Sequence, residues 1–176
     1  MKTLQDNELI DRALRGETKA FSTLADRHYM TVYRYAFRWV AAREDAEDVT
    51  QEVFIKLANS LQGFNRRAAF TSWLYRITAN CAKDFLRKNK RWHHNQAADP
   101  TDEVMASPNP GPESRSMHCQ IVAAIHRLPE KLQEATLLVL GEELSHREAA
   151  DVLGCAETTV SWRIFQARKK LQKVLS

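Results

Sequence analysis

Charged, amide and aromatic side chains gather on two consecutive predicted helices between residues 45 and 88, in a pattern that suits binding. The first helix carries an acidic stripe at helical spacing, which consists of Asp45, Asp48 and Glu52. The second carries a basic stripe with the aromatic residue Tyr75 nearby, and its members are Arg76, Asn80, Lys83 and Arg87. An acidic helix suits a basic protein partner, whereas cations beside an aromatic ring and an amide suit unpaired nucleic acid.

Both stripes also have a plainer interpretation, because a run of charge is often only the solvated face of a core helix. Acidic residues near a helix start are in addition favoured by the helix dipole. Phe64 before the basic stripe, with Tyr75 and Asn80 within it, favours nucleic-acid binding, since an unstacked base needs stacking and hydrogen-bonding partners. Trp73 has the spacing of a core residue.

The elements that position these stripes are predicted to be helices, because apolar residues recur at nearly 3.6-residue spacing and no strand is readable. The fold class is therefore all-α. A short helix closed by Gly16 and a long one over residues 18–40 form the scaffold, and Thr71 is the predicted N-cap of the basic helix. The predicted buried seams are Ala46, Val49, Val53 and Leu57 in the first stripe-bearing helix and Leu74, Ile77, Cys81 and Phe85 in the second.

Four of the five prolines fall between residues 93 and 116, which also contain several serines and asparagines. This composition predicts a flexible Pro-rich linker between two small helical domains. The predicted boundaries are 1–92 for the first domain, 93–116 for the linker and 117–176 for the second. Helices are expected over 117–127, 130–143, 145–153 and 156–174.

The last two of these helices have the spacing of a helix-turn-helix, with Gly154 in the turn. The predicted core positions are Ala149, Val152, Leu153, Val160, Ile164, Ala167 and Leu171. The outward positions are Glu157, Thr158, Ser161, Trp162 and either Phe165 or Gln166, with Arg163 and Arg168 able to reach phosphates. Short polar groups there can read base edges in a major groove, although a bland amphipathic helix pair has the same core spacing.

Composition excludes several other classes of protein. The 176 residues are 44% hydrophobic with a net charge of +4, enough apolar content for packed cores and too much for a disordered tail. Three widely spaced cysteines fit neither a disulfide framework nor a zinc site, so we expect a reducing cytoplasm and no metal or cofactor. We expect neither export nor membrane insertion, since the chain has no apolar leader or 18-residue apolar run. No catalytic motif is recognisable, so no enzyme is predicted.

Three segments together resemble the extracytoplasmic-function (group IV, RpoE-like) sigma factors, the small promoter-specificity subunits of bacterial RNA polymerase. DAEDVTQEVF resembles region 2.2, FTSWLYRITANCAKDFLRK resembles region 2.3, and LSHREAADVLGCAETTVSWRIFQARKKL resembles region 4.2. The resemblance covers nearly the whole chain and implies binding to core RNA polymerase, promoter recognition, DNA melting and transcription initiation at a specific set of genes.

The resemblance also assigns roles by position. It implies β′ clamp contacts at Asp45, Asp48, Gln51 and Glu52, and contacts to the −10 element at Phe64, Tyr75, Arg76, Asn80, Lys83 and Arg87. It implies contacts to the −35 element from Thr158, Thr159, Ser161, Trp162, Arg163, Gln166 and Arg168. The helices before the helix-turn-helix would touch the β flap, and an anti-sigma factor would hold the protein inactive.

The recognition helix departs from the family pattern, which often has a proline, a glycine and a serine where this chain has Ala156, Thr158 and Trp162. The bulky Trp162 could alter the −35 preference or pack inward. A competing hypothesis is a stand-alone regulator that binds duplex DNA through the helix-turn-helix, with or without dimerisation, and has no use for Tyr75 and Asn80.

Overall fold

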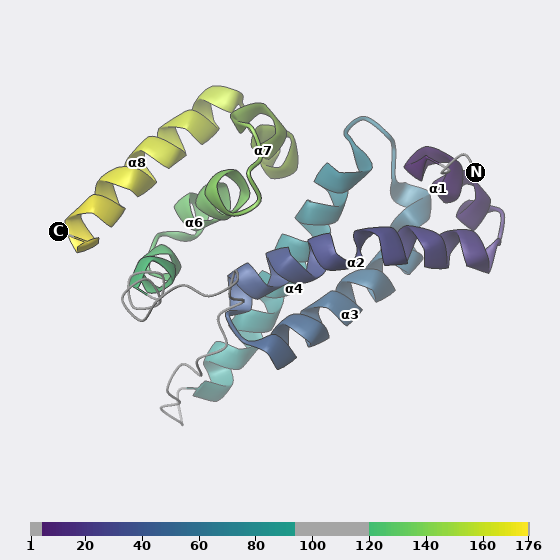
Figure 1. The fold of residues 1–176 in the computed structure, drawn as a ribbon, viewed down its shortest axis with the longest axis horizontal. Helices are drawn as coiled ribbons and strands as arrows, with labels where there is room; N and C mark the ends of the chain where they lie inside the picture. The colour runs from purple at the N-terminus through teal and green to yellow at the C-terminus, as the bar shows by residue number, and fades with distance from the viewer. Residues whose placement is uncertain (1–4, 94–119, 176) are drawn as a thin grey trace, which may run out of the picture. The chain divides into compact units, whose positions relative to one another are not determined.

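The structure is a computed structural model that describes residues 5–93 and 120–175, with the backbone alone for residues 90–93 and 175. Within these ranges every regular element is a helix, which confirms the all-α prediction (Figure 1). The chain divides into two compact units, Met1–Asp99 and Pro100–Ser176. Of the predicted linker, His93 is the last residue of a helix and residues 94–116 lie outside the described ranges.

The first unit is a helical bundle organised around one long helix. Its elements are α1 (Asp6–Leu14), α2 (Thr18–Val40), α3 (Arg43–Ser60), the short 3-10 turn η1 (Leu61–Gly63) and α4 (Phe70–His93). Helix α2 packs against α1, α3 and α4, and α3 also packs against α4. The large side chains fully buried between these helices include Leu9, Ile10, Leu24, Tyr35, Trp39, Leu57 and Leu74.

Helix α1 is held on α2 by one carboxylate. Asp6 accepts a hydrogen bond from Arg27 Nη1 at 2.6 Å, and its other oxygen lies 2.8 Å from His28 Nε2. The chain turns after α1 at Gly16, where φ is +91°, a conformation that glycine adopts without the strain imposed by a Cβ. Gly16 thus closes the first helix, as the sequence predicts.

The predicted seam of α3 is confirmed, because Ala46, Val49, Val53 and Leu57 are all buried. The seam of α4 is only partly as predicted. Leu74 and Cys81 are buried, but Ile77 and Phe85 are half-buried. Because α2 and α3 both cover α4, the buried face of α4 is wider than one seam and also includes Thr78 and Ala82.

The predicted start of α4 is wrong by one to two residues. The amide of Trp73 donates to the carbonyl of Ala69 at 3.2 Å, so the first helical bond begins before Thr71. Thr71 is the second residue of the helix rather than its N-cap. The residue before the helix is Ala69, whose side chain cannot cap, so the capping signal at Thr71 does not mark the first backbone hydrogen bond of the helix.

The second unit contains a helix over residues 120–126, α6 (Glu130–Thr136), a π-helical turn η2 (Leu137–Gly141), α7 (His146–Leu153) and α8 (Glu157–Leu175). The prediction of a single α-helix over 130–143 is therefore wrong in its second half. That part of the chain is a π-helical turn, and it ends at Gly141. Helix α6 packs on α8, and a core cluster joins Ala124, Leu128, Leu132, Ala167 and Leu171.

The helix-turn-helix is present where the sequence predicts it. Helix α7 begins with a capping box, in which Ser145 Oγ accepts from the Glu148 amide at 3.2 Å and Glu148 Oε2 accepts from the Ser145 amide at 2.8 Å. It ends at Gly154, where φ is +62°. None of the helices in the described part of the chain is long and apolar enough to cross a membrane.

Candidate nucleic-acid interface

The acidic stripe lies on the outer side of α3, beside its buried seam. Asp48, Gln51 and Glu52 are exposed, and Asp45 is half-buried. Glu52 Oε1 lies 3.4 Å from Lys56 Nζ, and Lys56 lies 3.8 Å from Asp84 on α4. Exposed pairs of this kind contribute little to stability, so the stripe remains a negatively charged surface that a partner can approach.

An apolar residue that sequence reasoning missed lies on the same face as the acidic stripe. Ile55 follows Asp48 by seven residues and Glu52 by three, so the three side chains share one side of α3. Ile55 is 59% exposed, so an apolar side chain lies among the charges of this face. The signal was present in the sequence, since Ile55 falls outside the predicted seam.

The basic stripe lies along one outer face of α4. Arg76, Asn80 and Arg87 are exposed and Lys83 is half-buried, so the predicted common face is confirmed. Arg87 Nη1 lies 3.5 Å from Asp84 Oδ1 on the same helix. The stripe therefore presents cationic groups and one amide to solvent next to the acidic edge of α3.

Tyr75 does not lie beside the basic stripe, which corrects the prediction. Its side chain is 8% exposed and its ring meets the ring of Tyr35 edge-on, with 5.0 Å between centroids. The physical reason is the wide buried face of α4, because Tyr75 lies on the same side as Thr78 and Ala82. A ring packed in the core offers no face on which a base can stack.

The accessible aromatic surface is formed instead by Trp73 and Phe64. The sequence predicts Trp73 in the core, but its side chain is half-buried and stacks on Phe64 with centroids 5.1 Å apart and planes 30° apart. Trp73 precedes Arg76 by three residues and Asn80 by seven, so it belongs to the same face of α4 as the basic stripe. The buried ring of Phe70 supports both from below, at 5.6 Å and 6.1 Å.

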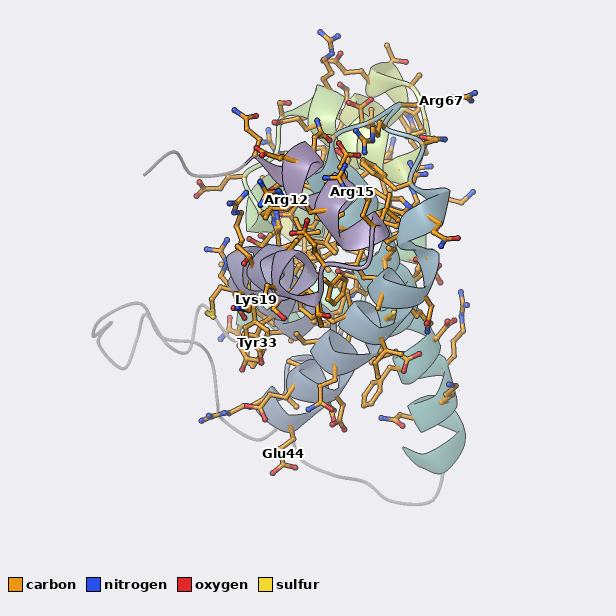
Figure 2. The ribbon with its side chains drawn as sticks, turned by 90° about the vertical axis from the view of Figure 1, so that its right-hand side faces the viewer. Arg12, Arg15, Lys19, Tyr33, Glu44 and Arg67 are labelled. Carbon is orange, nitrogen blue, oxygen red and sulfur yellow. The ribbon has the colours of Figure 1, made fainter. Side chains whose placement is uncertain are left out.

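The loop between η1 and α4 adds further cations to this end of the bundle. Arg66 adopts φ of +59° and forms an ion pair with Asp11 of α1, which ties the loop to the first helix. Figure 2 shows Arg67 reaching outward from this loop, and Arg12 and Arg15 lie on α1 in the same view. Neither loop arginine was among the predicted site residues, although both directly follow Phe64-Asn65 in the sequence.

Cys81 lies beneath the two stripes and is a structural residue. Burial raises the pKa of its thiol, and the nearby Lys56 ammonium only partly opposes this effect. The thiol is therefore protonated and unreactive at neutral pH. The described residues contain no cluster of three or more potential metal ligands.

In the second unit, α8 presents the predicted outward set. Val160, Ile164 and Ala167 are buried, which confirms the predicted core face. The exposed residues on the other side include Glu157, Thr158, Ser161, Trp162, Phe165 and Arg168. Thr159, Arg163 and Gln166 are half-buried at the boundary between the two faces.

Comparisons with known proteins agree with this arrangement. The family Sigma-70 region 2 matches residues 24–92, which contain both stripes, and the family Sigma-70, region 4 matches residues 120–171, which contain the helix-turn-helix. The ECF RNA polymerase sigma-E factor of Haemophilus influenzae is 32% identical over a 185-residue alignment that covers 96% of this chain and 94% of that protein.

Two solved structures share the fold. CnrH, solved in complex with the cytosolic domain of CnrY, superposes with a TM-score of 0.72 at 26% identity and covers 97% of this chain and 96% of its own. The sigma factor RpoE, in a co-crystal structure with the anti-sigma factor NepR from Bartonella quintana, gives a TM-score of 0.69 at 21% identity, covering 90% and 98%.

Two helical units, one with a stripe-bearing bundle and one with a helix-turn-helix, define a class of proteins that select promoters for a polymerase. The chain belongs to the sigma-70 family, in its extracytoplasmic-function group. It binds RNA polymerase and directs transcription initiation from promoters, and like other sigma factors it has no enzymatic reaction of its own.

Proposed function

We propose that α3 docks on the clamp of the polymerase β′ subunit through the acidic stripe. The observation that carries this proposal is the exposed face on which Asp48, Gln51 and Glu52 surround the apolar side chain of Ile55. An apolar contact within a charged rim is the usual composition of a specific protein interface. The charges steer a basic partner to the face, and Ile55 supplies area that is removed from water on docking.

We infer that α4 captures an unpaired base of the −10 element. Phe64, Trp73 and Asn80 border the site, because the two rings offer a stacking surface and the amide can hydrogen-bond a base edge. Unpairing costs a few kcal/mol per base, and stacking on an aromatic ring returns roughly 1 to 3 kcal/mol. The cations of the basic stripe, Arg76, Lys83 and Arg87, would hold the sugar-phosphate backbone, together with Arg67 from the preceding loop.

The second unit is proposed to read the −35 element. Helix α8 would enter the major groove with its first two turns, where Thr158, Thr159, Ser161, Trp162 and Gln166 lie, and Arg163 and Arg168 would contact phosphates. Docking of the preceding helices on the β flap is supported by Leu140 in η2, which is 47% exposed. Residues 93–116 would connect the two domains as a linker.

An anti-sigma factor is proposed as the regulatory partner. CnrH was solved with the cytosolic domain of a second protein and RpoE with an anti-sigma factor, and both share the fold of this chain. The acidic stripe with Ile55 is the surface such a partner would need to cover in order to block polymerase binding. Since polymerase and promoter DNA are the other partners, we propose that the protein acts in the cytoplasm.

The test is run-off transcription from a promoter library with core polymerase, with and without this protein. New start sites that share two upstream elements support the proposal. Polymerase-independent binding of duplex DNA without any new start site would instead support a stand-alone regulator.

The docking assignment is tested separately with a charge reversal. Asp48→Arg should abolish core polymerase binding and leave the fold intact, because the side chain is exposed. Asp26→Arg makes the same charge change at an exposed position of α2 and should leave binding unchanged. Equal effects of the two variants would mean that net charge, rather than this face, governs binding.

A further inference from the structure

Two large aromatic side chains lie exposed on α8 in the part proposed to enter DNA. Trp162 is 59% exposed and Phe165, three residues later, is 63% exposed. Thr158 precedes Trp162 by four residues, so its methyl group lies on the same side of the helix. We call Trp162 and Phe165 the aromatic pair. Neighbouring exposed rings of this size are typical of a binding surface.

The aromatic pair cannot be accommodated in the core of its own unit. Val160, Ile164 and Ala167 occupy the inner face of α8 with exposures of 0%, 3% and 1%. An indole has no space there, because packed interiors leave few voids larger than a water molecule. Of the two orientations that the sequence leaves open for Trp162, the structure therefore shows the outward one.

The polar group next to the aromatic pair is already engaged within the protein. Ser161 Oγ donates to the Glu157 carbonyl at 3.1 Å and lies 2.8 Å from His146 Nδ1 on α7. The hydroxyl of Ser161 therefore has two partners within the protein, the Glu157 carbonyl and the His146 ring. Ser161 is thus already engaged within the protein, and the large exposed side chains beside it, Trp162 and Phe165, are apolar.

The surrounding charge indicates that DNA covers this surface. From Glu157 to the end of the chain there are five basic residues and one acidic residue. Arg168 and Lys169 are exposed one turn beyond Phe165 and can reach phosphates on either side of a groove. An apolar contact flanked by cations suits a major groove, where the thymine C5-methyl is the only apolar group that a base pair presents.

We propose that the aromatic pair reads thymine in the −35 element by contact with its C5-methyl group. The inference rests on the proposed entry of α8 into the major groove and adds the base that is read and the residues that read it. Helix rise places the two residues about 4.5 Å apart along α8. Stacked base pairs are about 3.4 Å apart. Because Trp162 and Phe165 lie less than one turn apart on α8, they would contact the same or neighbouring base pairs, so the element should contain at least one A·T pair there.

The experiment removes the methyl group from the DNA. Holoenzyme assembled from this chain and core polymerase is bound to a promoter whose −35 element has been located by run-off transcription. Each thymine of that element, on either strand, is replaced in turn by deoxyuridine, which pairs identically but lacks the methyl. Loss of one buried methyl should weaken binding about fourfold at one or two adjacent positions.

Protein variants then assign the effect to the two rings. Trp162→Ser should bind the thymine and deoxyuridine promoters equally at one of these positions, and Phe165→Ser at the other. Val174→Ser is the matched control, since Val174 is 57% exposed further along α8 and should leave the discrimination unchanged. Circular dichroism of each variant checks that the unit is folded.

Two results would overturn the proposal. One is wild-type holoenzyme that binds thymine and deoxyuridine promoters equally at every position. The other is a folded Trp162→Ser variant that keeps the full discrimination. In both cases wild-type start sites would still be obtained on the unmodified promoter, so the proposed −35 function would stand. Absence of any protein-dependent start site would refute that function instead.

Discussion

Truncation of Ile55 tests whether this face of α3 docks on core polymerase. The expected loss of affinity follows from the exposure of the side chain. Complete burial of an isoleucine side chain contributes about 1.5 to 3 kcal/mol. Since 59% of this side chain is still exposed in the structure, docking can bury that share, which corresponds to about 1 to 2 kcal/mol. Ile55→Ala should therefore weaken binding to core polymerase by roughly 5- to 30-fold. The free energy of unfolding should change little, because the side chain contributes little to the core.

The measurement is fluorescence-detected binding of labelled protein to core polymerase at fixed ionic strength. Leu14→Ala is the control, since Leu14 is 41% exposed but lies on α1, which packs on α2 rather than on α3. If the Ile55 and Leu14 variants bind as tightly as wild type, or lose affinity equally, Ile55 lies outside the interface and the reasoning from its exposure fails.

The remaining predictions concern the DNA-binding elements. Trp73→Leu should reduce open-complex formation, measured by permanganate reactivity of unpaired thymines, by about 5-fold or more without loss of core binding, because a stacked base contributes roughly 1 to 3 kcal/mol. Arg163→Ala should weaken promoter binding in gel-shift titrations and leave core binding unchanged; equal losses would mean that Arg163 is structural. Ser145→Ala removes the cap of α7 and should lower the free energy of unfolding by about 1 kcal/mol in urea titrations.

The capping box also predicts a pH dependence. Hydrogen bonds from the Ser145 hydroxyl and amide hold the pKa of Glu148 below its usual value. A carboxylate with a lowered pKa in the folded state stabilises the fold above its unfolded pKa, and this stabilisation is lost as pH falls through the folded value. Wild type should therefore lose stability in acid more steeply than Glu148→Gln, as measured by thermal unfolding between neutral and acidic pH. Parallel profiles would contradict the role of Glu148.

Helix positions and the inner face of α8 could be predicted from sequence because local signals specify them. Gly16 and Gly154 mark helix ends where φ is positive, and the bounds predicted for α2 match those observed. The core face of α8 follows from a single spacing, since one side of that helix packs on α6 and α7. Where one neighbouring layer decides what is buried, periodicity is sufficient.

The same reasoning fails on α4, because α2 and α3 together bury a face of α4 that is wider than one seam. Tyr75 and Trp73 are two residues apart, so they point about 200° apart around the helix, and periodicity must assign one to the core. Around the helix, Leu74 and Cys81 lie between Trp73 and Tyr75. The predicted seam therefore does not decide which of these two rings is buried. Packing of both α2 and α3 on α4 buries Tyr75 against Tyr35, a residue 40 positions earlier in the chain. No local pattern contains that information.

The burial of Tyr75 in place of Trp73 changes the chemistry of the proposed −10 site. With Tyr75 buried, the stacking surface is the indole of Trp73, supported on one face by Phe64 and continuous with Arg76 and Asn80 along α4. Phe64 stacks on the indole and Phe70 also packs against it, so only part of the ring is available to a base. We therefore expect the proposed site to take a single unstacked base rather than a run of them. A single captured base needs further favourable contacts to offset melting of its neighbours, and the cations along α4 and in the loop before it are placed to supply them through the phosphates.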